Sequence, residues 1–427
     1  MKIRFYNAKI LQTHANHAFS VLEGELWVEG QRISFVGTAD EAAGHTPPQW
    51  EREIDVSGNL LMPGFKDAHT HTPMTFLRSF ADDLPLQEWL HQKVFPREAL
   101  LTEEAAYWFS LLGIMEYLTS GITSGFDMYF LTKAVTRATA DSGFRMVQTS
   151  GVNDFASSPE EMEEEYWYVN ELCDRTSYLV GFHAEYTTSR ETMRSVAALA
   201  EKLKSSVWFH NAETRQEVED CKKRYGLTPT QLADELQMFG YGGGGYHCVW
   251  LEENDFEIFK RRGLTAVTNP ASNLKLASGI CPVKRLVDEG IAVAIGTDGP
   301  ASNNCLDMFR EMFLVAGLAK VREMDAKCVA AEEVLYMATA GGARAMGLID
   351  CDCLAEGKYA DLICMDLRQP NMQPQHNIVK NLVYSGSKQN VKLAMVDGRI
   401  LYEDGKFDIG FAPEEIYRRT AEFAWKL

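Results

Sequence analysis

The chain has 427 residues, of which 46% are hydrophobic and 24% charged, and its formal net charge is −18 at pH 7. This composition is typical of a globular protein with one large domain and a smaller one. A protein that follows a nucleic-acid backbone needs a basic face. Here the basic residues are interspersed with acidic ones, so we expect no nucleic-acid partner. No apolar run reaches the length of a membrane span, and the first residues lack the apolar core of a signal peptide.

The nine cysteines are scattered, and none of them forms a C-x-x-C pair. The two closest in sequence are Cys351 and Cys353. An odd count without pairing is typical of a reduced cytoplasmic protein rather than of a disulfide framework or a thiolate zinc site.

The two ends of the chain share one pattern. Residues 2–11 and 25–36 alternate apolar and polar side chains and predict strands, with a turn at Gly30-Gln31. Residues 361–365 and 391–402 repeat this pattern, with a hairpin turn at Asp397-Gly398. We expect these segments to pair into one small β domain, a β sandwich formed from residues 1–61 and 355–410, followed by a C-terminal helix over residues 411–427.

The middle of the chain, residues 62–354, alternates short apolar runs with amphipathic helical stretches such as 191–204 and 230–239. The runs lie at residues 60–67, 122–128, 145–149, 179–183, 207–210, 245–249, 266–268 and 291–297. Buried strands that alternate with helices indicate an α/β fold with a parallel sheet. Eight such units predict a closed (β/α)8 barrel of the TIM type.

Polar side chains with metal-binding chemistry end several of these runs. His69 and His71 end the first run, and because they are two residues apart they point to the same side of a strand. His210, His247 and Asp298 end the fifth, sixth and eighth runs. Barrel active sites form at the carboxyl ends of the strands. A lone histidine at a strand end is more commonly hydrogen-bonded or exposed to solvent. Because such residues end several of the runs, however, we favour one shared site. Nitrogen and oxygen ligands suit zinc or iron with an open position for water.

Two further features allow more than one interpretation. Glu213 lies three residues after His210 and can act as a proton shuttle if the chain turns after Asn211. Alternatively, Glu213 is an acid at a helix N-terminus that faces the dipole. The polar stretches 269–273 and 299–304, the second of which contains Ser302, either line the mouth of a pocket or only form turns.

The chain resembles the amidohydrolase superfamily, and within it the S-adenosylhomocysteine/methylthioadenosine deaminase group. The resemblance is close over roughly residues 55–350, and it rests on the stretches PGFKDAHTHTPM, WLHQKVFPREALLTEE, GITSGFDMYF, HNAET, HCVWL, NPASNLKLASGI and GTDGPASNN. The cytidine-deaminase signature, H-x-E with P-C-x-x-C, is absent and excludes that other zinc-deaminase fold.

The resemblance implies one divalent metal ion, zinc with iron as the alternative. It implies that the ligands are His69, His71, His210 and Asp298. It further implies that Asp298 takes a proton from the attacking water, that Glu213 protonates the ring nitrogen, and that His247 polarises the water and stabilises the developing oxyanion.

On the substrate side, the resemblance implies that Glu98 holds ribose hydroxyls. Ser150 stands where the group carries an arginine for the homocysteine carboxylate. Glu185 stands about where the group has a histidine near the purine, and His183 lies two residues earlier. We expect Glu185 to present an acceptor to the ring, and we expect S-adenosylhomocysteine to be a poor substrate because the arginine clamp is missing.

These features predict a metal-dependent hydrolytic deaminase of an aminated N-heterocycle. The best candidate is an adenosine-type nucleoside: methylthioadenosine, 5′-deoxyadenosine, adenosine or S-adenosylhomocysteine. The alternatives are deamination of a small cyclic amidine such as creatinine, guanine or cytosine, and hydrolytic release of chloride from a ring. A non-catalytic scaffold typically loses its metal ligands, which this chain retains. We also expect a small-molecule substrate, no membrane association, and a homodimer or a higher homo-oligomer.

Overall fold

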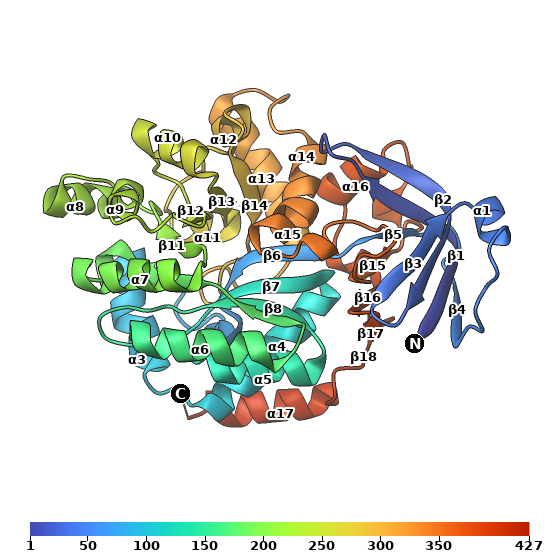
Figure 1. Ribbon diagram of the computed structural model, residues 1–427, viewed down its shortest axis with the longest axis horizontal. Helices are drawn as coiled ribbons and strands as arrows, with labels where there is room; N and C mark the ends of the chain where they lie inside the picture. Colours follow the sequence, from blue (N-terminus) through green and yellow to red (C-terminus); the bar gives the residue numbers. More distant parts are fainter. Residues whose placement is uncertain (427) are drawn as a thin grey trace.

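The structure, a computed structural model, describes residues 1–426; Leu427, the last residue of the predicted C-terminal helix, lies outside the described residues. A helix-covered barrel and a smaller sheet lie side by side, and the small sheet combines the blue N-terminal and red C-terminal strands (Figure 1). Within residues 1–426, no helix combines the length and the apolar character needed to cross a membrane.

The barrel consists of parallel strands that are buried almost throughout. These are β6 (Phe65–Thr70), β7 (Ile122–Met128), β8 (Arg145–Thr149), β9 (Thr176–Tyr178), β10 (Val180–Ala184), β11 (Val207–Asn211), β12 (Gly243–His247), β13 (Thr265–Thr268) and β14 (Ala292–Ile295). Only Leu179 separates β9 from β10. These two strands together occupy one of the eight strand positions of the barrel. The barrel closes between β14 and β6, where the Asp298 amide donates to the His69 carbonyl at 2.9 Å. The predicted (β/α)8 barrel is confirmed.

Apart from residues 122–128 and 145–149, the predicted barrel strands differ from the observed ones at one or both ends, and two of these differences have a clear cause. The run 60–67 is not one strand, because β5 (Leu60–Pro63) belongs to the small sheet and only β6 belongs to the barrel. Gly64 separates them, and a Cβ at this position would lie 2.2 Å from the Thr123 side chain. The sixth barrel strand begins at Gly243 rather than Gly245, because its first glycines carry no apolar side chain that a sequence pattern could register.

The small sheet contains nine strands, eight of them along one path. Its order is β18-β17-β16-β15-β5-β1-β2-β3, with β4 paired to β1. The bounds are β1 (Lys2–Thr13), β2 (Phe19–Glu29), β3 (Arg32–Gly37), β4 (Arg52–Asp55), β15 (Leu362–Met365), β16 (Val391–Val396), β17 (Arg399–Glu403) and β18 (Lys406–Phe407). A core cluster that includes Phe5, Leu26, Leu61, Leu362 and Met395 packs residues from both chain ends together. The sequence patterns at the two ends therefore do pair, as predicted.

Helices cover the outside of the barrel, and one short helix lies on the small sheet. Their bounds are α1 (Ala39–Ala43), α2 (Leu86–Trp89), α3 (Phe95–Glu98), α4 (Glu103–Thr119), α5 (Thr132–Ser142), α6 (Pro159–Leu172), α7 (Arg190–Leu203), α8 (Arg215–Tyr225), α9 (Pro229–Glu235), α10 (Glu253–Arg262), α11 (Pro270–Lys275), α12 (Val283–Asp288), α13 (Met308–Glu323), α14 (Ala331–Tyr336), α15 (Gly342–Ala345), α16 (Ile378–Tyr384) and α17 (Pro413–Ala424). Helix α17 packs against α4 and runs along one side of the barrel (Figure 1).

A buried ion pair joins the barrel to the small sheet. Arg145, the first residue of β8, donates to Asp361 Oδ2 at 2.6 Å and to Asp397 Oδ1 at 3.3 Å. Asp361 precedes β15, and Asp397 lies in the predicted turn between β16 and β17. Burial opposes the charge of Asp361, but Arg145 holds its pKa below the usual range. The pair fixes the amino end of the barrel against the C-terminal strands.

Candidate active site

Five polar side chains converge at the carboxyl end of the barrel. His69 lies on β6 and His71 follows it, His210 lies on β11, His247 ends β12, and Asp298 follows β14. All five are buried. His247 and Asp298 have φ angles of 70° and 60°, in the left-handed region. Such backbone conformations cost about 1–3 kcal/mol and cluster at functional sites.

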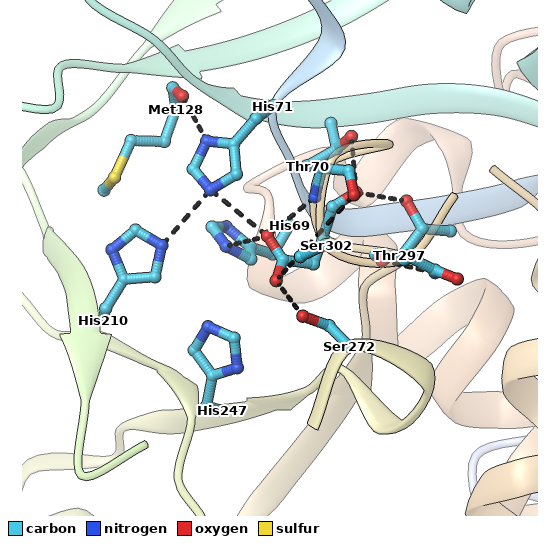
Figure 2. Close-up of polar contacts among 12 residues, drawn as sticks. His69, Thr70, His71, Met128, His210, His247, Ser272, Thr297 and Ser302 are labelled. Atoms are coloured by element: carbon cyan, nitrogen blue, oxygen red, sulfur yellow. Dashed lines mark hydrogen bonds and ion pairs between the residues drawn. The ribbon is translucent and has the colours of Figure 1, made fainter. Parts of the chain in front are cut away.

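The ligand atoms have the spacing of a metal centre. His71 Nε2 lies 3.3 Å from His210 Nε2 and 3.3 Å from Asp298 Oδ1, and His69 Nε2 lies 3.6 Å from the same oxygen (Figure 2). Nitrogen and oxygen ligands bind zinc at about 2.0–2.2 Å, so tetrahedral ligands around one ion are roughly 3.3–3.6 Å apart. The four side chains therefore fit a single divalent ion.

Hydrogen bonds fix the orientation of two of these rings. His71 Nδ1 donates to the Met128 carbonyl at 2.6 Å, and His210 Nδ1 donates to the His183 carbonyl at 2.7 Å. Both Nε2 lone pairs then face each other, and they repel unless a proton or a metal ion lies between them. Burial lowers the pKa of His71, but Asp298 outweighs it and raises this pKa to about 9. Both ring nitrogens of the buried His69 have no hydrogen-bond partner within residues 1–426. A proton on His71 would relieve the repulsion but would leave His69 without a partner. A metal ion would instead bind His69, His71 and His210 together.

Asp298 is held by side chains from helix α11 and from the turn that follows β14. Ser272 Oγ and Ser302 Oγ both donate to Asp298 Oδ2, and the Gly299 amide donates to Oδ1 at 2.7 Å (Figure 2). Burial opposes the charge of Asp298, but the surrounding histidines hold its pKa well below the usual range. The polar residues after the last two barrel strands thus orient a carboxylate that is charged in the resting site.

Glu213 points into the site rather than along a helix axis. The chain turns at Ala212, whose φ angle is 53°, and the acid in the first turn of α8 is Glu217. Glu213 Oε1 accepts from Ser278 at 2.9 Å, and its Oε2 lies 3.8 Å from His247 Nε2. Burial raises the pKa of Glu213. This geometry favours the proton-shuttle interpretation of Glu213 over the helix-dipole alternative.

These groups form the inner end of a cavity of about 320 Å³. Its other walls are mainly apolar and aromatic. They include Met74, Leu86, Trp89, Leu90, Val94, Phe95, Tyr129, Phe130, Phe155, Tyr186 and Leu276. Many of these residues come from the short helical segment 86–98, which covers one side of the cavity. The sequence prediction missed this wall, because its side chains lie outside the barrel strands and follow no simple period.

Glu98 and His183, which were predicted to bind substrate, line the cavity. Burial raises the pKa of Glu98 to about 7, although Tyr129 and His71 oppose the rise. Burial also lowers the pKa of His183 to about 3, so its ring is neutral at physiological pH. Both therefore offer hydrogen-bonding groups within an otherwise apolar wall.

Three other predicted substrate contacts lie outside the cavity lining. Glu185 does not face the ring as expected, because it forms a two-point ion pair with Arg224, with Nη2 at 2.5 Å from Oε2. The chain leaves β10 at Ala184 and enters a 3₁₀ turn, which rotates Glu185 outward. Ser150 is fully buried behind the cavity wall. Ser302 contacts Asp298 and so reaches the site only through that carboxylate.

The sequence profile of the Amidohydrolase family matches residues 60–401. The chain belongs to the amidohydrolase family. One amidohydrolase relative, described as a 5-methylthioadenosine/S-adenosylhomocysteine deaminase of Dictyoglomus thermophilum, is 41% identical over 82% of this chain and 83% of its own. Another, described as a 5′-deoxyadenosine deaminase of Methanothermobacter thermautotrophicus, is 38% identical over 92% of both chains.

Solved amidohydrolase structures share the whole fold. A zinc-bound structure described as an adenosine deaminase from Xanthomonas campestris superposes with a TM-score of 0.91 at 33% identity, over 100% of this chain and 98% of the other. An atrazine chlorohydrolase from Arthrobacter aurescens, at 20% identity, has a TM-score of 0.88 over 99% and 100% of the two chains. The second likeness concerns the fold alone. The resemblance to amidohydrolases read from the motifs is confirmed.

Proposed function

We propose that this amidohydrolase is a metal-dependent hydrolytic deaminase of an adenosine-type nucleoside whose 5′ substituent is uncharged. One observation carries the proposal. Glu213, a buried acid, and the four ligand side chains meet at the inner end of one cavity that is otherwise mostly apolar. A group that gives a proton and a group of metal ligands, placed side by side, are what hydrolysis of a ring amine requires.

We propose zinc as the metal, bound once per chain by His69, His71, His210 and Asp298. Two candidate ligand groups, one with His71 and His210 and one with His247 and Asp298, share His69 and therefore describe one centre. The all nitrogen-and-oxygen donor set suits zinc, with iron as the alternative. The zinc-bound relative from Xanthomonas campestris supports the choice.

When bound, such an ion lowers the pKa of a water molecule toward about 7, so that the water can attack at neutral pH. Asp298 accepts one proton of this water while the oxygen attacks the ring carbon that bears the amine. Glu213, whose pKa burial raises, donates its proton to the adjacent ring nitrogen. The amino group then takes the proton from Asp298 and leaves as ammonia, and the second water proton restores Glu213.

His247 orients the attacking water. Its Nδ1 is paired with Asn273 Oδ1 at 2.8 Å, so Nε2 faces Glu213 and the cavity. An unprotonated Nε2 accepts a hydrogen bond from the water.

The cavity walls support a nucleoside with an uncharged tail. Glu98 is a buried acceptor that can hold two neighbouring ribose hydroxyls. Toward solvent the cavity is bounded by Phe95 and by Phe155, which is 62% exposed. Within residues 1–426, no Lys or Arg side chain lines the cavity. A zwitterionic homocysteine tail therefore has no cation to pair with, whereas a methylthio, methyl or hydroxyl group does not need one.

The proposal is tested by measuring ammonia release and kcat/KM for methylthioadenosine, 5′-deoxyadenosine, adenosine, S-adenosylhomocysteine, guanine, cytosine and creatinine. We expect the three nucleosides with uncharged 5′ groups to be the best substrates. A clear preference for a free base or for creatinine would overturn the proposal that the substrate is a nucleoside. A preference for S-adenosylhomocysteine would overturn the proposal that its 5′ substituent is uncharged. We also propose a cytoplasmic location, which the nine free cysteines support. Assembly into a homodimer or a higher homo-oligomer stays a prediction.

A further inference from the structure

His69 differs from the other histidines of the site in how its ring is held. In His71, His210 and His247, Nδ1 is hydrogen-bonded to the Met128 carbonyl, the His183 carbonyl and Asn273 Oδ1, respectively. In the part of the chain that the structure describes, His69 Nδ1 has no such partner. Its ring instead stacks on the ring of Tyr246, with centroids 3.7 Å apart and an angle of 18° between the planes.

A histidine that binds a metal normally donates its second ring nitrogen to a neighbour, and this bond fixes the ring orientation. Without that bond, rotation about the last side-chain torsion is soft, because this torsion has broad minima. The stacked face of Tyr246 restricts the same rotation by packing. His69 and Tyr246 are both 0% exposed, so no water molecule can take over the role of the missing partner.

Tyr246 is itself held in place from other sides. Its ring lies nearly parallel to Trp208, with centroids 5.8 Å apart at 21°, and meets the edge of Phe126 at 5.9 Å and 81°. Gly244, two residues before Tyr246, leaves room for this cluster, because a Cβ there would lie 2.6 Å from the Trp208 ring. The aromatic rings thus form a packed layer of the barrel interior directly beneath the metal ligands.

The hydroxyl of Tyr246 contributes no hydrogen bond to this packing, among the described residues. It is buried and has no hydrogen-bond partner among residues 1–426. A buried hydroxyl without a partner carries a desolvation cost. The part of Tyr246 that acts on the site is therefore its ring.

We infer that Tyr246 is a positioning residue for the metal ligand His69, and that its ring does by stacking what a hydrogen bond does for His71 and His210. The inference rests on the metal site proposed above. It goes beyond the proposed function because it assigns a role in metal affinity to a side chain that touches neither substrate nor metal.

The test is the zinc dissociation constant, measured by competition with a chromophoric chelator on the full chain. Tyr246→Phe keeps the ring, and we expect its affinity to stay within about threefold of the wild type. Tyr246→Leu removes the ring, and we expect about a 10–100-fold weaker affinity, the range found when groups that orient metal ligands are lost. Tyr246→Met is the second non-aromatic variant, because a flexible methionine fills irregular space if leucine does not fold.

Phe126→Leu is the matched control, since it removes a ring from the same layer that has no stacking contact with His69. We expect Phe126→Leu to lower the melting temperature and, because its ring meets only the edge of Tyr246, to weaken zinc binding less than Tyr246→Leu does. Wild-type zinc affinity in a folded Tyr246→Leu or Tyr246→Met variant would overturn the inference. Equal losses in Tyr246→Phe and Tyr246→Leu, or an equal loss in Phe126→Leu, would overturn it too. If the wild-type chain binds no zinc, the proposed metal site fails instead.

Discussion

His71 and His210 face each other across 3.3 Å through their Nε2 atoms, and each ring is fixed from behind by a backbone carbonyl. Side chains cannot easily rotate away from this arrangement, because the carbonyls belong to β7 and β10. The barrel therefore holds the two Nε2 atoms at the spacing of ligands to one ion before any metal binds. Because the ligands are preorganised in this way, a variant that lacks one of the two rings should lose much of its metal affinity.

The first prediction concerns metal content. His210→Ala removes one of these rings, and we expect the purified variant to lose its zinc and its turnover. His183→Ala is the control: it changes a side chain that lines the cavity but keeps the carbonyl that accepts from His210. Elemental analysis of both variants decides the matter, and full metal content with full turnover in His210→Ala would show that this ring is not a ligand.

The second prediction concerns proton transfer. Glu213→Gln keeps the size of the side chain but cannot protonate the ring nitrogen, so we expect unchanged metal content and about a 10²–10⁴-fold lower kcat. Glu165→Gln is the matched control, because Glu165 is another acid whose pKa burial raises, to about 7, yet it does not line the cavity. A loss below about threefold in Glu213→Gln would place the proton donor elsewhere.

The third prediction concerns the mouth of the cavity. Phe155 is largely exposed and meets the edge of Phe95 at 5.5 Å, so we expect an apolar 5′ substituent to pack against both rings. Phe155→Ala should lower kcat/KM for methylthioadenosine about fivefold, equivalent to about 1 kcal/mol of partial burial, and should affect adenosine less. Trp167→Ala, at an exposed position of α6 outside the cavity lining, should change neither value. Equal losses for the two nucleosides would show that Phe155 does not contact the substituent.

The fourth prediction concerns pH. Burial raises the pKa of Glu98 to about 7, and only its charged form accepts two hydroxyl hydrogen bonds. The KM for methylthioadenosine should therefore rise as the pH falls below about 7 and should level off above it. In Glu98→Gln this dependence should disappear while KM stays high throughout. Steady-state kinetics between pH 6 and 8 gives both profiles, and an identical pH profile of KM in the two proteins would exclude Glu98 as the group that titrates.

The fifth prediction concerns the joint between the barrel and the small sheet. Arg145→Ala leaves Asp361 buried without its partner, and removing one member of a buried ion pair costs about 3–5 kcal/mol. Because Arg145 lowers the pKa of Asp361, the pair stabilises the protein above the unfolded pKa of about 3.9, and this contribution is lost as the pH falls further. Thermal unfolding at pH 7 and at about pH 3 should show a gap in stability between wild type and variant that is large at pH 7 and smaller in acid. A gap of the same size at both pH values would mean that the charge of Asp361 is not involved.

Much of the barrel could be predicted because burial on both faces leaves a direct record in the sequence. Most barrel strands are short, largely apolar runs, and His69, His210 and Asp298 stand at or after the ends of three of them. The carboxyl ends of parallel strands must share one edge, so the ligand cluster follows from position alone.

The cavity wall could not be predicted in the same way. Glu185 and His183 are two residues apart, and on a continuing strand they would point to the same side. The 3₁₀ turn that begins at Glu185 breaks this relation. Arg224, which forms the ion pair with Glu185, comes from a helix much later in the chain. The orienting groups behind His71 and His210 are backbone carbonyls, which leave no mark on residue identity.

The position of β5 in the small sheet has a consequence for how the protein is made. Strand β5 pairs with β1 on one edge and with β15 on the other, where Leu61 faces Cys364. At about 5–20 residues per second, a ribosome needs roughly 15–60 s to synthesise the intervening barrel. During that interval one edge of β5 is open, although Leu60, Leu61 and Met62 are fully buried in the finished protein. A nascent chain stalled before β15 thus exposes an apolar strand edge, which is the kind of surface that chaperones bind and that aggregates recruit.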